Sequence, residues 1–122
     1  MTRIPELERD IIEKAIYLPM VLIVLNRDLL VFEKSPFKLK KPYLELIEEA
    51  MKSIQKELYE VKQFLRKNQI QVKEINRDES FTMFLFLYKG YEEQHNYFNP
   101  RIRNKVQELM EYYLFKRFLQ HG

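Results

Sequence analysis

Glu92 and His95 form the first arrangement in the sequence whose spacing suggests chemistry. They belong to a Glu-x-x-His motif, which on a helix places a carboxylate and an imidazole on one face. Ferritin-like bundles use two such motifs, with a glutamate from each of two further helices, to bind di-iron. The other histidine, His121, has no glutamate three residues before it. Glu92 and His95 are therefore weak metal candidates beside a simpler interpretation, a hydrogen-bonded helix-end histidine, and we expect no metal and no cofactor.

Two basic clusters could contact phosphates. Residues 34–41 contain no acid, and residues 101–105 open a predicted helix. If the two clusters lie near each other, they would suit a nucleic-acid-binding accessory protein. No helix-turn-helix signature supports specific base reading, and the alternative is a solvated loop and helix start. The candidate phosphate-binding residues are Lys34, Lys38, Lys40, Lys41, Arg101, Arg103 and Lys105.

The parts needed for nucleophilic catalysis are missing. The chain has no cysteine, which excludes disulfides, thiolate metal ligands and a cysteine nucleophile. None of the three serines lies in a glycine-flanked elbow. Two histidines without a clear aspartate partner give little basis for acid–base catalysis. We therefore expect a protein that is not an enzyme.

Aromatic residues in two places indicate binding surfaces. In the C-terminal helix, Tyr112, Phe115 and Leu119 fall on another side from the main apolar stripe, which Phe118 widens, so the helix is apolar nearly all round. The pattern predicts an interface through which the chain self-associates, formed by Tyr112, Phe115, Phe118 and Leu119. Residues 88–98 are rich in tyrosine and phenylalanine, which combine apolar bodies with polar tips. This second stretch fits core packing, an interface or a small-ligand pocket.

Three segments have helical periodicity. Residues 5–33 carry two apolar stripes, and Pro19 is expected to kink this helix or split it in two. Residues 42–67 carry an unbroken heptad pattern, which favours packing against a helix of the same chain over a second copy. Asn99-Pro100 opens a helix that runs to about residue 119. The heptad residues are Leu44, Ile47, Met51, Ile54, Leu58, Val61 and Leu65.

The region between the second and last helices is ambiguous. Residues 68–77 alternate apolar and polar positions, as in a short extended segment. Residues 79–94 match a helical spacing at Phe81, Phe84, Leu85 and Tyr88, but they also have strong strand propensity. A hairpin of 69–75 with 81–88 is thus conceivable. Possible caps before residue 81 and the polar continuation favour a helix, which Gly90 would weaken by roughly 1 kcal/mol.

These elements predict one domain over residues 1–122 with an all-α fold. The expected architecture is a small bundle of about four helices, the first kinked at Pro19, with a short extended segment between the second and third. Only two glycines occur among 122 residues, which argues against sandwiches, barrels and phosphate-cradling loops.

The apolar run Ala15–Leu25 is too short to span a bilayer. Acidic residues precede it, whereas a signal peptide would have positive charge there. We therefore expect a cytoplasmic protein with no membrane partner.

The chain resembles a group of small uncharacterised proteins from spore-forming, Gram-positive bacteria. The stretches that carry the resemblance are RIPELERDIIEKAIYLPMVL at 3–22, SPFKLKKPYLELIEE at 35–49 and YKGYEEQHNYFNPRIRNKVQELMEYYL at 88–114. The resemblance implies a bacterial cytoplasmic protein and assigns no activity or functional residue. The residues and the resemblance together predict a small, non-enzymatic interaction or regulatory protein that forms a homo-oligomer or binds a protein partner.

Overall fold

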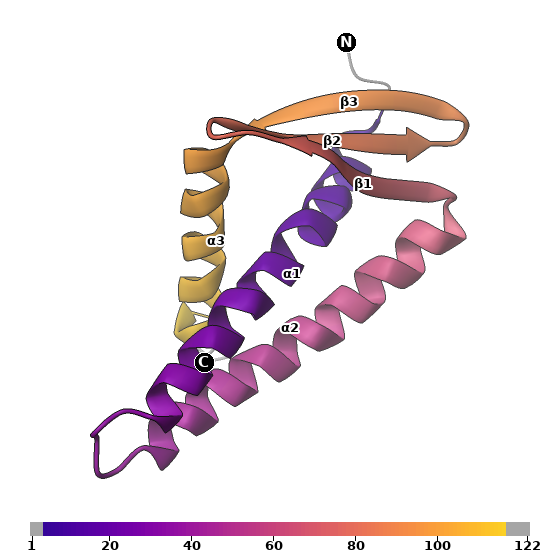
Figure 1. Cartoon of the computed structure of the whole chain (residues 1–122). Coiled ribbons are helices and arrows are strands. Elements are labelled where there is room, and N and C mark those ends of the chain that lie inside the picture. Colours follow the sequence, from indigo (N-terminus) through magenta and orange to yellow (C-terminus); the bar gives the residue numbers. More distant parts are fainter. Residues whose placement is uncertain (1–3, 117–122) are drawn as a thin grey trace.

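The chain folds into a helical hairpin, a three-stranded sheet and a third helix. The computed structural model describes residues 4–116. The first two helices run antiparallel, the sheet lies across the end where the first begins and the second ends, and the third helix returns alongside the first (Figure 1). The elements are α1 (Glu6–Glu33), α2 (Lys41–Lys67), β1 (Ile70–Arg77), β2 (Phe81–Tyr88), β3 (Tyr91–Phe98) and α3 (Asn99–Leu114).

The prediction of an all-α bundle of four helices is wrong, because residues 70–98 form an antiparallel sheet in the order β1-β2-β3. The fold class is therefore α+β. The segment expected to be a third helix, residues 79–94, contains β2 and the first half of β3. The hairpin alternative for residues 69–88 is confirmed, since Ile70 pairs with Tyr88 and Val72 with Phe86. β2 buries every second side chain, with Thr82, Phe84, Phe86 and Tyr88 facing the helices.

Gly90 has a different role from the one predicted. It forms a two-residue turn with Lys89 between β2 and β3, where Tyr88 pairs with Tyr91. Both turn residues have positive φ, 49° at Lys89 and 88° at Gly90. This conformation matches the twist of a tight hairpin, and glycine adopts it without steric cost. The glycine that would have weakened a helix therefore favours the hairpin.

The two long helices are confirmed close to their predicted bounds. α1 continues through Pro19 as one helix, so it is not split. The heptad side of α2 packs mainly against α1, as expected for contact within one chain. Ile47, Ile54, Leu58, Val61 and Leu65 of that heptad are buried, and Leu44 and Met51 are half-buried. Asn68 ends α2, where its Nδ2 donates to the Phe64 carbonyl at 2.8 Å.

Among the described residues, α1 is the one helix long and apolar enough to cross a membrane. Its most apolar 18-residue window has a mean hydropathy of 1.8. The apolar run predicted from the sequence ends at Leu25, whereas this 18-residue stretch includes no more than two charged residues. Core helices of soluble proteins meet the same criteria, and α1 packs against α2 and α3. This property of α1 is therefore weak evidence for a membrane span.

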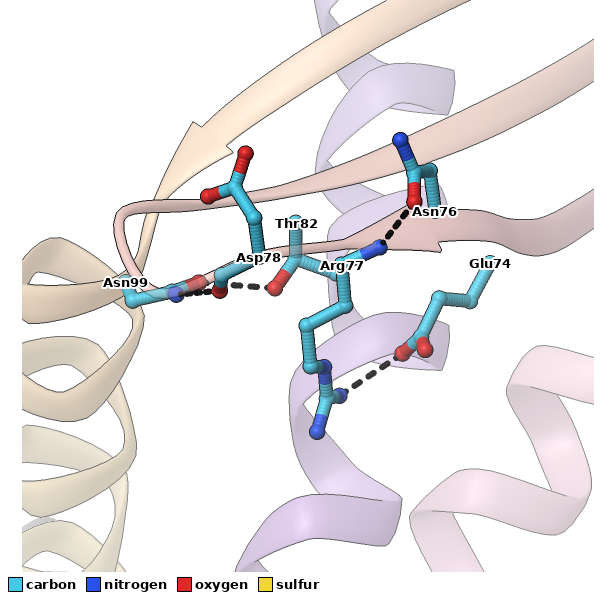
Figure 2. Close-up of polar contacts among 6 residues, drawn as sticks. All are labelled: Glu74, Asn76, Arg77, Asp78, Thr82 and Asn99. Carbon is cyan, nitrogen blue, oxygen red and sulfur yellow. Dashed lines mark hydrogen bonds and ion pairs between the residues drawn. The ribbon is translucent and has the colours of Figure 1, made fainter.

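Asn99 attaches the sheet to α3. Its Oδ1 accepts a hydrogen bond from the buried Thr82 hydroxyl at 2.7 Å, and its Nδ2 donates to the Asp78 carbonyl at 2.9 Å (Figure 2). The Asp78 carboxylate in turn accepts the backbone N–H groups of Ser80 and Phe81. These hydrogen bonds hold the β1–β2 turn and lower the pKa of Asp78. The first residue of α3 thus holds both β2 and the β1–β2 turn.

Glu57 joins the three helices through two contacts. Its carboxylate on α2 accepts a hydrogen bond from the Tyr113 hydroxyl on α3 and pairs with Lys14 Nζ on α1 at 2.9 Å. Burial by itself raises the pKa of Glu57, but the bonds from Tyr113 and Lys14 outweigh burial and hold the pKa below its ordinary value of 4.5. The folded state therefore favours the ionised carboxylate.

Thr82→Val should lower the free energy of unfolding by about 1–3 kcal/mol, because it leaves the Asn99 amide oxygen without its donor. In an Asn99→Ala background the same change should be nearly neutral, since both partners are then absent. Urea unfolding of the four proteins measures the coupling. An equal cost of Thr82→Val in both backgrounds would show that this hydrogen bond does not hold the sheet to α3.

Glu57→Gln should flatten the dependence of stability on pH below about 4.5. Because the folded-state pKa is lowered, the ionised group stabilises the protein above the unfolded-state pKa, and that contribution disappears as the pH falls through the folded value. The stability difference between wild type and variant should thus narrow on acidification. Urea unfolding at a series of pH values tests this, and a gap that stays constant contradicts it.

Candidate functional site

A polar cleft of about 580 Å³ lies between α1, β3 and α3. α1 and α3 diverge beneath the β3 edge of the sheet (Figure 1), and side chains from all three elements line the space between them. The lining residues are Arg9, Glu13, Tyr17, His95, Asn96, Tyr97, Phe98, Arg101, Asn104, Lys105 and Glu108.

Local periodicity places these side chains. Arg9, Glu13 and Tyr17 are four residues apart, so they follow one face of α1. Alternation along β3 turns His95 and Tyr97 to the inner face of the sheet, where they pair with Phe84 and Thr82 of β2. The cleft therefore exists because three elements each present a polar row toward the same space.

Tyr97 and Glu13 connect the strand to α1. The Tyr97 hydroxyl donates to Glu13 Oε2 at 3.0 Å, and the Tyr17 and Tyr97 rings meet edge to face with centroids 6.3 Å apart. Burial raises the pKa of Tyr17 to about 12, with a further contribution from the Glu13 carboxylate. Burial and Glu13 also raise the pKa of Tyr97. Both hydroxyls therefore stay protonated near neutral pH, and that of Tyr97 donates its proton to the hydrogen bond with Glu13.

The guanidinium groups of Arg9 and Arg101 are the main cationic groups of the cleft. Within the described part of the chain, no carboxylate lies within ion-pairing distance of Arg9 or Arg101. The positive charge of Arg101 partly offsets the raised pKa of Tyr17, and that of Arg9 partly offsets the raised pKa of Tyr97. Lys105 makes only an exposed contact of 3.8 Å with Glu108. The cleft thus presents cationic and neutral donors from which an anion could accept hydrogen bonds.

His95 has its partner on its own strand. Its Nε2 donates to Glu93 Oε1 at 2.9 Å, and its ring stacks on Phe86 with centroids 4.3 Å apart. Glu92, three residues from His95, lies on the opposite face of the sheet. The Glu-x-x-His spacing joins two ligands on a helix but separates them on a strand. Over residues 4–116 no group of three His, Cys, Asp or Glu side chains could hold a metal ion.

The comparison with known families agrees with the resemblance that the sequence suggested. The model of the YhjD protein family matches residues 3–118. The chain belongs to the YhjD family. It is 54% identical over 106 residues to "Uncharacterized protein YhjD" of Bacillus subtilis (strain 168), a match that covers 87% of this chain and 88% of that protein. The predicted membership in a group from spore-forming, Gram-positive bacteria is confirmed. No solved structure matches the chain.

The predicted phosphate-binding residues of this YhjD family member do not form one surface. Arg101 and Lys105 line the cleft, whereas Arg103 lies beside a smaller hollow with Met20 and Ile23. Lys34, Lys38, Lys40 and Lys41 lie in and after the α1–α2 loop, at the far end of the helical hairpin from the sheet (Figure 1). The joint basic surface that the nucleic-acid alternative requires is thus not formed by these seven residues.

The predicted interface lies at the end of α3. Phe115, the residue after the helix, is 59% exposed. Tyr112 is half-buried and meets the Tyr113 ring edge to face at 5.0 Å. Phe118 and Leu119 lie outside the described residues. Of the four predicted interface residues, the two that the structure describes, Tyr112 and Phe115, therefore lie at the surface or close to it.

Sequence reasoning missed the contribution of α1 to the cleft. Arg9 and Tyr17 were not identified as site residues, and Glu13 was considered only as a carboxylate for the metal site, although the four-residue spacing of the three is visible in the sequence. A search for helix faces that combine an arginine, an acid and a tyrosine would have identified this side of α1 as a candidate binding surface. Their relation to Tyr97, 84 residues beyond Glu13, depends on the fold.

Proposed function

We propose that this YhjD family member is a non-enzymatic cytoplasmic binding protein whose cleft takes a small anionic ligand. The observation that carries the proposal is the pair Arg9 and Arg101, which line the cleft without a carboxylate partner among the described residues. A planar guanidinium can bind a carboxylate or phosphate group through two parallel hydrogen bonds.

The other lining groups narrow the ligand class. A volume of about 580 Å³ lies within the range of sites for small molecules. Tyr17 and Tyr97 offer a wall of aromatic surface, and the Glu13 carboxylate, which accepts a hydrogen bond from Tyr97, adds an acceptor group. A ligand that carries a hydroxyl or amino group next to its anionic group would satisfy both the arginines and Glu13. Hydroxy acids and sugar phosphates have this chemistry.

Several features favour binding over catalysis. Both cleft tyrosines are held protonated, so neither is available as a general base near neutral pH. The imidazole of His95 already donates to Glu93. The lack of cysteine fits a reducing cytoplasm. Binding a ligand therefore needs fewer chemical groups beyond those that line the cleft than catalysis would need.

A second proposed activity is self-association through the end of α3. Phe115 is a large apolar side chain with more than half of its surface exposed, next to the aromatic pair Tyr112 and Tyr113. Exposed aromatic residues are enriched at interfaces between proteins. A regulatory protein could combine such an interface with a ligand cleft near the other end of the same helix.

A ligand of the proposed class should raise the thermal midpoint of the protein in a saturable way. At a concentration 100-fold above its Kd it should stabilise the fold by about 2.7 kcal/mol. Differential scanning fluorimetry with phosphate, citrate, gluconate and glycerol phosphate provides the screen, and calorimetry measures the affinity. Arg101→Gln should weaken binding about 10- to 100-fold by removing charged hydrogen bonds.

Arg103→Gln is the matched control, since Arg103 is on the same helix but lies beside the other hollow. It has the same change in charge and should bind as the wild type does. If no compound shifts the midpoint, or if the two variants lose binding equally, the cleft is not the anion site that we propose.

Phe115→Glu should weaken a dimer without unfolding the monomer, because the side chain is exposed and a charge there opposes apolar association. Analytical ultracentrifugation of wild type and variant at several concentrations measures this. Leu7→Glu, at an apolar side chain that is 71% exposed near the start of α1, is the control and should leave association unchanged. A monomeric wild type would end the proposal of self-association.

A further inference from the structure

The α1–α2 loop exposes apolar side chains at the end of the molecule farthest from the sheet (Figure 1). We call this region the hairpin tip, and it comprises residues 30–43. Leu39 is 79% exposed and Phe37 is 55% exposed. Leu30, Val31 and Tyr43 are also at least half exposed. Exposed apolar side chains gathered on one narrow projection indicate an interaction site.

The tip holds its shape through aromatic contacts. Phe32 stacks on Tyr43 with centroids 5.7 Å apart and on Phe37 at 6.0 Å. The Ser35 hydroxyl donates to the Phe32 carbonyl at 2.7 Å, and Lys40 Nζ donates to the Glu33 carbonyl at 2.8 Å. The loop is therefore braced in a conformation that leaves Phe37 and Leu39 exposed.

The charge of the tip is positive. Glu33 is the one acid in the tip sequence, and residues 34–44 contain none. Lys41 makes a long, exposed contact of 3.9 Å with Glu45, which contributes little. Within residues 4–116, no ion pair involves Lys34 or Lys38. The four lysines of the tip are Lys34, Lys38, Lys40 and Lys41.

We propose that the hairpin tip docks on the surface of an anionic lipid bilayer. Phe37 and Leu39 enter the boundary between headgroups and acyl chains, while the lysines stay at the level of the lipid phosphates. Lysine suits this position because its methylene stem lies along apolar surface and its ammonium remains in water. The combination of an apolar apex with a surrounding basic region is the composition of interfacial membrane anchors.

The shape of the tip favours a bilayer over other partners. A narrow projection buries little area against a rigid protein surface, but a fluid bilayer closes around it. Nucleic acid would use the lysines and leave the exposed Leu39 and Val31 unexplained. The expectation of no membrane partner rested on the absence of a spanning segment, and docking of a loop needs none. The cleft, at the sheet end, stays in water.

Vesicle binding tests the charge part of the proposal. The full chain should cosediment with vesicles of equal parts phosphatidylcholine and phosphatidylglycerol, and much less with phosphatidylcholine alone. Each lysine near an anionic surface changes partitioning by about fivefold, so Lys34→Ala with Lys38→Ala should reduce binding about 25-fold. The matched control is Lys56→Ala with Lys62→Ala, two exposed positions on α2, which should bind as the wild type does.

Tryptophan fluorescence tests insertion of the apex. The chain has no tryptophan, so Leu39→Trp places a single reporter at the tip, and Tyr59→Trp places one at a side chain of α2 that is 65% exposed. With anionic vesicles the Leu39→Trp emission should move to shorter wavelength and be quenched by brominated lipids. The Tyr59→Trp emission should not change.

Three outcomes would overturn the proposal. One is no binding to anionic vesicles at low salt. Another is binding that both lysine pairs reduce equally, since this would indicate general attraction by net charge. The third is binding without a change in Leu39→Trp emission. Tight binding of RNA or DNA with no vesicle binding would assign the lysines to nucleic acid instead.

Discussion

The inner face of the three-stranded sheet is the constraint on which the rest of the structure depends. β2 places fully buried Phe86 at its centre, with Phe84 and Tyr88 on either side. A sheet of three strands is stable only if this apolar face is covered. The cover comes from the helices, with Ile12 and Ile16 of α1 in the same buried core. Asn99 fixes the angle at which α3 leaves the sheet, because it bonds to both Thr82 and Asp78.

The cleft follows from the same constraint. The central strand β2 is apolar on the inner face, but the edge strand β3 carries Glu93, His95 and Tyr97 there. The helices need not close over polar side chains, and α1 and α3 diverge at this edge (Figure 1). Arg9 and Arg101 then line a space that the core does not fill. The site is a consequence of where the apolar part of the sheet ends.

The helices could be predicted from the sequence because their signals are local. The heptad of α2 repeats over several turns, and every member is buried or half-buried. The sheet was harder, since residues 81–88 satisfy both a helical spacing and strand propensity. Pairing across the chain decided between them: Phe86 lies between Val72 and Glu93, contacts that no local window contains. The Lys89-Gly90 pair was a local sign of the β2–β3 turn, but Gly90 was interpreted as a weak point of a helix.

The candidate site could be predicted only in part, because it too depends on contacts between segments that are far apart in the sequence. Arg101, Lys105 and His95 were selected by residue type, and the fold brings them into one cleft. Glu92 was selected on helical spacing and lies on the other face, so the error in secondary structure became an error in the site. The α1 residues were missed because contact between Glu13 and Tyr97 exists only after the sheet has been placed on the helix.

The two basic regions differ in residue type in a way that matches their surroundings. The cleft has Arg9 and Arg101 beside Lys105, and the planar, weakly hydrated guanidinium groups of the two arginines suit directional bonds to an anion. The tip has four lysines and no arginine between residues 34 and 43. Lysine is a strongly hydrated point charge on a flexible stem, which suits a surface where the phosphates have no fixed geometry. Because α1 extends from the cleft to the tip as one helix, the chain can hold the tip at a surface while the cleft remains open to solutes.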